Sequence, residues 1–532
     1  MSRSNLIRQH SPKEGVDIMF RTILVGLPRC RLVGLLVVCI LLTSSALFSI
    51  GDAKASSSTS SYSLPTWWAK YQRLLTGSSS SPSSQGQAFS VGSNVDVSNE
   101  DTPQSETSIT VNPNTPTMLV GGSNEIVRLP MRGYFSSDGG KTWGAVDLPL
   151  PPPATTNGVD FGSDPGVAFD TRGNVYYSYI VVFFNRFFAS IQGTEMAVAK
   201  SSDGGRTWPQ VTFFNFNSGS GKFNDKPMIA VDTNPHSPFR DSVYVAWDNA
   251  SLNAGKSSAN DDLLFARSTD GGKTFSSPVA LNNPTGGPRE VIGADPFVGP
   301  NGEVYVAWHD IQQNILMVNR SFDGGATFGQ QQAIAATTVA FDDAIPAMAS
   351  RHALLYPACD ADRSAGSNRG TLYCSWMDET ASNGTDIFVS RSTGRGASWS
   401  MPTRVNDDPA GVRKDQFNQW LSVDPVTGSV DLSWNDARND PADTKTDIYF
   451  SQSTGGGLSF APNIKVTTAV SDESAINSCA DAGNQYGDYE GIVAFGGRID
   501  PIWTDGRLDC SVDPATGQQI GEEIFTALVT AS

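Results

Sequence analysis

Short apolar runs in which small and large side chains alternate recur along the chain from about residue 90. Examples are VYVAWDN at 243–249, VYVAWHD at 304–310 and VDLSWND at 430–436. The runs are rich in Val, Tyr and Trp and are bounded by Gly, Asp, Asn or Pro, which is the pattern of short β-strands joined by tight turns. No long stretch has helical periodicity. We therefore predict an all-β fold.

The predicted strands are grouped in repeated units. An octapeptide of the type SSDGGKTW occurs at 136–143 and returns at 201–208, 268–275, 321–328, 392–399 and 453–460. The copies are 53 to 71 residues apart, and the intervals hold further strands of similar pattern. Four short strands in each unit of this length are typical of a β-propeller.

Seven units can be counted, and the seventh, from Gly483 onward, has three strands and no octapeptide. The stretch VDVSNEDTPQSE at 95–106 resembles PTRVNDDPAGVRKDQ at 402–416. We expect it to supply the missing strand of the last blade and to close the ring, which leaves no long unpaired sheet edge. The prediction is a seven-bladed propeller of four-stranded blades over residues 89–532. A six-bladed ring is the alternative if the first or last unit is something else.

Two segments precede the repeats. Residues 1–55 hold several arginines, the apolar run 32–50 and the sequence Ala-Lys-Ala at 53–55, as in an export signal. An uncleaved signal anchor is the alternative, because about 19 mostly apolar residues can just span a bilayer. Residues 56–88 are a linker rich in Ser, Gly and Pro. The propeller is therefore expected to be extracellular or on the cell surface, with membrane contact only through an uncleaved N-terminal segment.

Export implies an oxidising compartment for the cysteines that follow the leader. Four remain, and they allow three disulfide pairings. We favour Cys359 with Cys374 and Cys479 with Cys510, because each pair would join the two arms of one predicted hairpin. They are structural candidates and not metal ligands, since no C-x-x-C spacing exists.

The charge excludes some partners. The chain has a net charge of −17, and residues 1–55 are basic, so that the remainder carries −21. No basic stripe is available to neutralise phosphates, so nucleic acid is not an expected partner. We expect a monomer that needs no cofactor, although the surplus of Asp leaves Ca²⁺ as an option.

The octapeptide resembles the Asp-box, or bacterial neuraminidase repeat, of the sialidase-like propellers, and its first two copies match that motif fully. The resemblance spans roughly residues 95–530 and implies the fold more than an activity. Its Gly-Gly pair permits positive φ, its Asp can accept hydrogen bonds from its own turn, and its Thr can close the loop. We therefore assign a structural role to Asp138, Asp203, Asp270 and Asp323.

Acidic residues flank the predicted strands at the opposite face of the ring. They precede the first strand of a blade or follow the second, and should converge at the mouth of the central channel: Asp164, Asp225, Asp295, Asp415, Asp488, Asp248, Asp310, Asp378, Asp436 and Asp505. Such carboxylates could bind sugar hydroxyl groups, hold Ca²⁺ or perform acid–base chemistry. The alternative is structural, with each Asp capping a turn.

The family resemblance implies a catalytic hypothesis. Sialidases hold a substrate carboxylate with an arginine cluster and use a Tyr nucleophile and an Asp acid/base. On this chain the residues that would bind substrate are Arg438, Arg507, Asp436, Asp505 and Asp488, and the catalytic ones are Tyr486 or Tyr489, Glu490, and Asp295 or Asp225. The early Arg-Ile-Pro motif of the family is absent, and a third arginine would have to be Arg128, Arg132 or Arg289.

Three functions are consistent with these patterns. We favour a non-catalytic propeller that binds glycans, glycoconjugates or proteins through the acidic mouth. The second is a sialidase-like glycoside hydrolase, and the third is a Ca²⁺-dependent or purely structural module of the cell envelope.

Overall fold

The computed structural model describes residues 88–531 apart from 101, 156, 220, 252–260, 283–289, 340, 381–383, 410, 475–482, 508–510 and 513–518. The predicted export segment, nearly all of the linker, and the cysteines at 479 and 510 lie outside these residues. Within the described part of the chain, no helix is long and apolar enough to cross a membrane.

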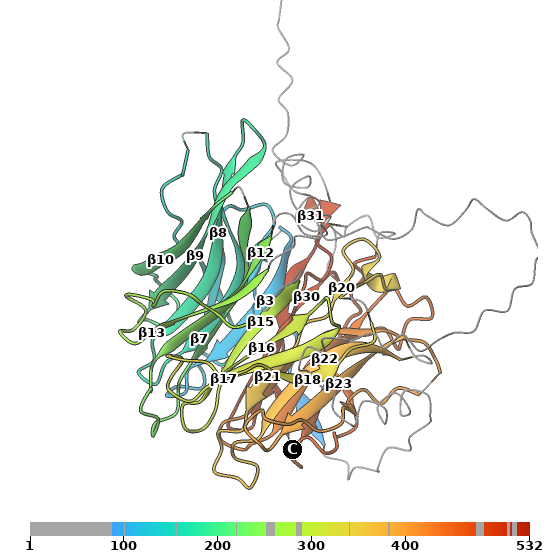
Figure 1. The fold of residues 1–532 in the computed structure, drawn as a ribbon. Coiled ribbons are helices and arrows are strands. Elements are labelled where there is room, and N and C mark those ends of the chain that lie inside the picture. The colour runs from blue at the N-terminus through green and yellow to red at the C-terminus, as the bar shows by residue number, and fades with distance from the viewer. Residues whose placement is uncertain are drawn as a thin grey trace, which may run out of the picture.

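The described chain folds into seven antiparallel sheets of four strands arranged in a ring (Figure 1). Blades 1 to 3 consist of β3 (Gln104–Val111), β4 (Leu119–Glu125), β5 (Arg132–Ser136), β6 (Gly144–Asp147), β7 (Phe161–Phe169), β8 (Val175–Asn185), β9 (Ser190–Ser201), β10 (Gln210–Ser218), β11 (Lys222–Val231), β12 (Val243–Ser251), β13 (Asp262–Ser268) and β14 (Val279–Ala280). The predicted all-β propeller is confirmed, and so is the number of blades.

Blades 4 to 6 repeat the same order from the channel outward. Their strands are β15 (Val291–Val298), β16 (Val304–Asp310), β17 (Ile315–Ser321), β18 (Gln332–Ala336), β21 (Ala358–Ala361), β22 (Leu372–Thr380), β23 (Gly384–Ser392), β24 (Thr403–Arg404), β25 (Gln416–Val423), β26 (Val430–Asp436), β27 (Asp447–Ser453) and β28 (Ile464–Lys465). Between blades 4 and 5 lies a segment with the hairpin β19 (Asp342–Asp343) and β20 (Ala353–Leu354) and the 3-10 turn η1 (Pro346–Met348).

The N-terminal strand completes blade 7, as predicted. This blade contains β29 (Gly491–Phe495), β30 (Arg498–Asp505), β33 (Glu523–Thr526) and, from the start of the chain, β2 (Val95–Asp96). The pair β1 (Phe89–Val91) and β34 (Val529–Ala531) extends the same sheet, and a short pair, β31 (Ser511–Val512) with β32 (Gln519–Ile520), lies beside it in sequence. The blue strand β3 of blade 1 lies beside the red strand β30 of blade 7, so the ring is closed (Figure 1).

The core lies between neighbouring blades. The second strand of five blades contributes a Trp that is almost fully buried, and these residues are Trp247, Trp308, Trp376, Trp434 and Trp503. Alternation along the strand sends the large side chains of each sheet into the two interfaces that it shares with adjacent sheets. Cys359 and Cys374 lie opposite each other on β21 and β22 and form a disulfide, which confirms that predicted pair.

The octapeptides are turns that follow the third strand of their blades. In the first copy, Asp138 accepts hydrogen bonds from the backbone N–H groups of Lys141 and Thr142 and from the Thr142 hydroxyl, at 3.1, 3.0 and 2.6 Å. These bonds, with Thr142 the largest contributor, lower the pKa of Asp138 to about 2. Gly139 and Gly140 both have φ near +77°, and the Gly139 carbonyl accepts a hydrogen bond from Arg498 of the neighbouring blade.

The other intact copies, with Asp203, Asp270 and Asp323, make the same bonds between the Asp and the following Thr. In the fifth copy, where Gly394 replaces the Asp, the turn is held by Ser392, whose hydroxyl accepts from the backbone of Gly396. All of these contacts are local or join adjacent blades. They account for the octapeptides as structural elements.

A truncation tests the closure of the ring. A chain that begins at residue 98 lacks β1 and β2, and therefore leaves β33 and β34 as unpaired edges. We expect its melting temperature to fall by at least about 5 °C and the protein to aggregate on heating. Calorimetry and light scattering, with a chain beginning at residue 88 as the control, make the measurement. Equal melting temperatures and equal solubility would contradict the closure.

Candidate functional site

The register of the sheets puts the predicted acidic residues at one end of the ring. Asp225, at the start of blade 3, pairs with Asp248, at the end of its second strand. The octapeptides lie at the far ends of the same sheets, since Ser136 of the first copy pairs with Leu119 at the start of β4. The end that carries the acids is called the mouth below. The predicted separation of the acids from the octapeptides is therefore present in the structure.

At the mouth end of each innermost strand, one residue lies at the axis of the ring. Near the mouth, the pairing of β3, β7, β11, β15 and β25 with the second strand is interrupted by a bulge. In these five blades, the residue two places before regular pairing resumes is buried. In blades 5 and 7 the inner strand begins where regular pairing begins, and the residue two places before it is buried as well. These residues form the central ring: Glu106, Asp164, Lys226, Gly293, Tyr356, Asn418 and Tyr489.

The backbone at five of these positions is left-handed, with φ between 44° and 80° in Glu106, Asp164, Lys226, Gly293 and Asn418. Residues other than Gly adopt this conformation rarely, and it costs free energy that the surrounding structure must supply. Its repetition at equivalent places in the blades marks the central ring as a feature of the architecture, since single accidental outliers would fall at unrelated positions.

The ammonium group of Lys226 lies at the centre of an aromatic cage. Its Nζ is 3.0 Å from the ring centroid of Tyr356, 4.1 Å from that of Tyr489 and 5.8 Å from that of Trp420. Gly293 makes room for the cage, because a Cβ atom at that position would lie 2.4 Å from Cδ1 of Tyr356. Burial lowers the pKa of Lys226 to about 8, and the nearby carboxylates of Asp488 and Glu106 oppose this shift.

Carboxyl groups surround the cage. The backbone N–H of Lys226 donates to both Asp164 and Asp225, at 3.0 and 3.1 Å, and these two carboxyl groups are hydrogen-bonded to each other. Burial, followed by the charge of Asp164, raises the pKa of Asp225 well above its ordinary value. Burial, followed by the charge of Asp488, does the same for Glu106. The charge of Asp164 therefore favours the protonated form of Asp225.

Arg351 covers the central ring from the segment between blades 4 and 5. Its guanidinium group donates to Glu106 of blade 1 at 2.6 Å and to Asp488 before blade 7 at 2.8 Å. Its backbone N–H is held by the side chain of Gln485 at 2.8 Å. The Arg351 side chain is 5% exposed. Burial acts against its charge, but Asp488 and Glu106 raise the pKa of Arg351 above its ordinary value. The segment is therefore fastened across the mouth to the opposite side of the ring.

Three of the ten predicted catalytic and substrate-binding residues meet at the mouth. Tyr489 and Asp225 lie in or beside the central ring, and Asp488 binds Arg351 above it.

Tyr486 packs on Phe417 and donates to the carbonyl of Ser471 at 3.3 Å. Glu490 accepts hydrogen bonds from Thr107 at 2.9 Å and from the backbone of Thr504. Asp295 accepts from the backbone of Cys359 at 2.6 Å, and burial raises its pKa to about 8. The contacts of all three are those of buried groups that join adjacent strands and blades.

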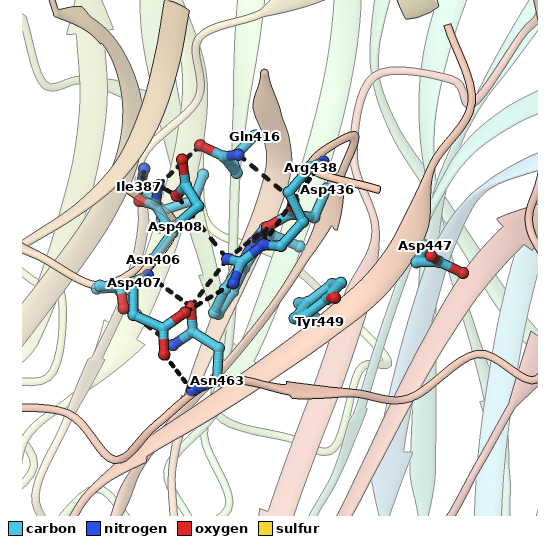
Figure 2. A network of polar contacts seen from close by, with 12 residues as sticks. Ile387, Asn406, Asp407, Asp408, Gln416, Asp436, Arg438, Asp447, Tyr449 and Asn463 are labelled. Atoms are coloured by element: carbon cyan, nitrogen blue, oxygen red, sulfur yellow. Dashed lines mark hydrogen bonds and ion pairs between the residues drawn. The ribbon is translucent and has the colours of Figure 1, made fainter. Parts of the chain in front are cut away.

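Arg438 is held by its own blade and by blade 5 (Figure 2). Its Nε donates to Asp436 at 3.0 Å, one Nη to Asp407 at 2.6 Å and the other to Asn463 at 2.9 Å, and its guanidinium group lies 4.2 Å from the ring centroid of Tyr449. Asp407 follows the outermost strand of blade 5, and Asn463 precedes that of blade 6. The interactions therefore join the outer strands of two blades.

Arg507 makes the equivalent contacts in blade 7. It donates to Asp505 at 2.6 Å, to Asn94 before β2 at 2.7 Å and to Thr468 after β28 at 2.9 Å. In both blades the Asp also accepts from a buried Trp two residues earlier. The two arginines thus belong to a repeated W-x-D-x-R arrangement at blade junctions. This arrangement favours a structural role, and substrate binding by Arg438 and Arg507 stays a prediction.

Sequence reasoning did not single out Glu106, Lys226, Arg351, Tyr356 or Asn418. A signal existed for some of them, since Lys226 in NDKPMIAVD has the place of Asp164 in SDPGVAFD, each just before a Pro. Aligning the five units that have a second-strand Trp would have given the ring positions Tyr356 and Asn418 as well. Arg351 lies between blades, outside the repeat, and no sequence pattern indicates it.

A small cavity lies inside the channel next to the central ring. Its volume is about 30 Å³, and its lining includes Thr107, Met228, Trp420 and Tyr489. A larger open hollow of about 520 Å³ lies at the opposite end, against the octapeptide of Asp323. No group of three or more His, Cys, Asp or Glu side chains in the described residues is arranged to hold a metal ion. The channel cavity thus adjoins Tyr489 of the central ring.

Comparisons with known proteins give only distant similarities. No family model matches the sequence, and no curated protein matches it. Among solved structures, the chain is similar to a protein of unknown function from Dyadobacter fermentans, with 13% identity, a TM-score of 0.44, and coverage of 84% of this chain and 99% of that one. Two glycoside hydrolases give similar values.

The first is the NanB sialidase of Streptococcus pneumoniae, with 10% identity, a TM-score of 0.43 and coverage of 70% of both chains. The second is the α-L-arabinofuranosidase Arb93A of Fusarium graminearum, with 15% identity, a TM-score of 0.44, and coverage of 68% of this chain and 98% of that one. With TM-scores below 0.5, none of these similarities bears on the function of this chain.

Buried acids predict how stability depends on pH. Burial raises the pKa of Asp248, Asp295 and Glu125 to about 8. The stability that these protonated groups contribute is complete below the ordinary carboxyl pKa of about 4 and is lost as the pH rises to 8. We expect the melting temperature to fall by on the order of 5–10 °C between pH 5 and pH 8, and to fall less in Asp295→Asn. A melting temperature that rises over this interval would contradict the prediction.

Lys226 predicts the opposite slope at higher pH. Its folded pKa of about 8 lies below the ordinary value of 10.5, so the folded protein loses this proton first and gains stability between pH 8 and 10. Lys226→Met should remove that gain and should stabilise the protein at pH 7 by on the order of 2–3 kcal/mol. Denaturant unfolding of both proteins at pH 7, 8, 9 and 10 measures the difference. A parallel pair of curves would show that the lysine is not buried as described.

Proposed function

We propose that this chain is an exported propeller that binds glycans at the mouth of its central channel, without catalysing a reaction on them. The observation that carries the proposal is the central ring, in which the carboxyl groups of Glu106 and Asp164 occupy positions equivalent to those of the aromatic side chains of Tyr356 and Tyr489. Carboxylates accept hydrogen bonds from sugar hydroxyl groups, and aromatic faces pack against the C–H faces of sugar rings. A site with both acidic and aromatic groups therefore suits a sugar ligand.

The contacts of the predicted catalytic residues support binding over hydrolysis. The guanidinium group of Arg438 already donates to Asp436, Asp407 and Asn463, so its observed hydrogen bonds are made within the protein. A Tyr nucleophile needs a lowered pKa or an adjacent base. Burial and the charge of Glu106 instead raise the pKa of Tyr489, and burial and Glu473 raise that of Tyr486.

Hydrolysis of a glycoside is a second candidate, and one observation favours it. Asp225 forms a carboxyl pair with Asp164, and burial together with the charge of Asp164 raises the pKa of Asp225. Such a pair could supply a general acid and a carboxylate. Asp225 would be the proton donor in this mechanism.

The disulfide between Cys359 and Cys374 supports export, because disulfides persist in oxidising compartments. The negative charge of the propeller agrees with a soluble extracellular protein. A place outside the cell would bring the mouth into contact with surface glycans.

A glycan array and an activity assay test the proposal together. The purified full chain should bind neutral glycans on the array and should release no product from fluorogenic sialosides, arabinosides or hexosides. Asp488→Asn should weaken binding by about tenfold, because the hydrogen bonds that this side chain accepts lose the strength that the carboxylate charge gives them. The matched control is Asp407→Asn, which alters an acid on the outer rim and should bind as the wild type does.

Two results would change the conclusion. Turnover by the wild type that disappears in Asp225→Asn would favour the hydrolase. The absence of both binding and turnover across the panel would contradict a glycan-directed function.

A further inference from the structure

Three side chains of the central ring carry a polar atom that has no hydrogen-bond partner among the described residues. These atoms are Nζ of Lys226, the hydroxyl of Tyr489 and Oδ1 of Asn418. The residues are only 3%, 2% and 3% exposed. Buried polar atoms are nearly always paired in folded proteins, and an unpaired one is costly. Three such atoms on one ring of seven positions leave hydrogen-bonding capacity there for a ligand or a water molecule.

The three groups belong to one small region. Nζ of Lys226 lies 4.1 Å from the ring of Tyr489 and 5.8 Å from that of Trp420, which is two residues beyond Asn418. Tyr489 and Trp420 also line the channel cavity of about 30 Å³. A space of this size can hold a water molecule or a single hydroxyl or hydroxymethyl group. A whole sugar ring would need the mouth above it.

The chemistry of the three groups selects the partner. An ammonium group only donates hydrogen bonds, so Lys226 requires an acceptor. The Asn418 amide donates through Nδ2 to the carbonyl of Gly487 at 3.2 Å, which fixes its orientation and leaves Oδ1 in need of a donor. A hydroxyl group accepts and donates at once. A carboxylate can only accept and an ammonium can only donate, so neither satisfies both groups.

We propose that the central ring binds a hydroxyl group of an uncharged sugar or polyol through Lys226, Asn418 and Tyr489. The inference rests on the proposed function, because it names the class of ligand for the same mouth. The preference for an uncharged ligand distinguishes this site from one that recognises an acidic sugar.

Arg351 determines how this hydroxyl group reaches the ring. In the closed arrangement its guanidinium group spans Glu106 and Asp488 directly above the cage. A ligand must displace the segment between blades 4 and 5, or slip past Arg351 on the side of Asp488, the more exposed of its two partners at 16%. Binding at the ring is thus coupled to the position of this segment.

Matched variants test the proposal. Tyr489→Phe removes one unpaired hydroxyl, and Lys226→Met removes the ammonium while keeping a flexible apolar chain. Tyr486→Phe is the control for the first, since Tyr486 is buried three residues away but is hydrogen-bonded to Ser471. Lys141→Met, on an exposed octapeptide turn, is the control for the second.

Calorimetric titration uses sets of sugars that differ only in charge. The probes are methyl glycosides of glucose, galactose and mannose, with the matching uronic acids and amino sugars, and glycerol as a minimal polyol. The neutral member of a set should bind at least tenfold more tightly than either charged member. Tyr489→Phe should weaken that binding about fivefold and Lys226→Met about tenfold or more, whereas both controls should bind as the wild type does.

Melting temperatures without sugar give a second readout that a purely structural role would not produce. Unpaired groups kept for binding should not stabilise the empty protein, so Tyr489→Phe and Lys226→Met should melt at or above the wild-type temperature. Tyr486→Phe, which loses a satisfied hydrogen bond, should melt lower. If Tyr489→Phe and Lys226→Met melt as low as Tyr486→Phe and leave sugar binding unchanged, the proposal is overturned.

The test also separates this inference from the function on which it rests. Array binding that is sensitive to Asp488→Asn but favours charged sugars would overturn the hydroxyl site and leave glycan binding intact. Glycerol binding that disappears in Lys226→Met, together with an empty glycan array, would support the hydroxyl site and contradict the glycan-directed function.

Discussion

The interruption of strand pairing at the mouth end of the inner strands is the feature on which the central ring depends. An uninterrupted strand sends alternate side chains into the two interfaces with adjacent blades, where apolar groups such as Trp247 and Trp434 are buried. The bulge ends that alternation and takes one residue out of the interface to the axis. The cost is the loss of some pairing and a left-handed backbone at Glu106, Lys226 and Asn418. The gain is a set of side chains at the axis that the packing of the blades does not dictate.

Charge balance at the axis follows from this arrangement. Lys226 and Arg351 are both buried, and an isolated buried cation would be prohibitive. They coexist with Asp164, Asp488 and other carboxyl groups, and the charge of Arg351 opposes the rise that burial causes in the pKa of Glu106. The two cations are stabilised differently. Arg351 has two carboxylate partners, whereas Lys226 relies on aromatic faces and keeps its hydrogen-bonding capacity unused.

The sequence predicts the scaffold far better than the site, for a physical reason. Octapeptides and second-strand motifs are local, so each copy contains all the partners that it needs, as Asp138 and Thr142 illustrate. The number of blades and the closing strand at 95–96 follow from counting such copies. The contacts of a ring residue are made by residues in other blades, as when Tyr356 and Tyr489 enclose Lys226. A single repeat unit therefore does not reveal them. Arg438 shows the converse, since a residue that looked exceptional in one unit is explained by its equivalent, Arg507, in the next.

Because the two ends of the ring are separate, the side chains at the mouth can differ between blades while the fold is maintained. At the octapeptide end, each turn packs on the preceding blade, and even the copies in which Gly394 and Gly455 replace the Asp keep the Ser-to-backbone bond. At the mouth, the central ring carries an acid, a lysine, a glycine, an amide or a tyrosine at equivalent positions, and the blades close around all of them. A position that accepts such different side chains is not selected for packing alone. The unpaired atoms of Lys226, Asn418 and Tyr489 lie at these variable positions, which is where we propose that a ligand binds.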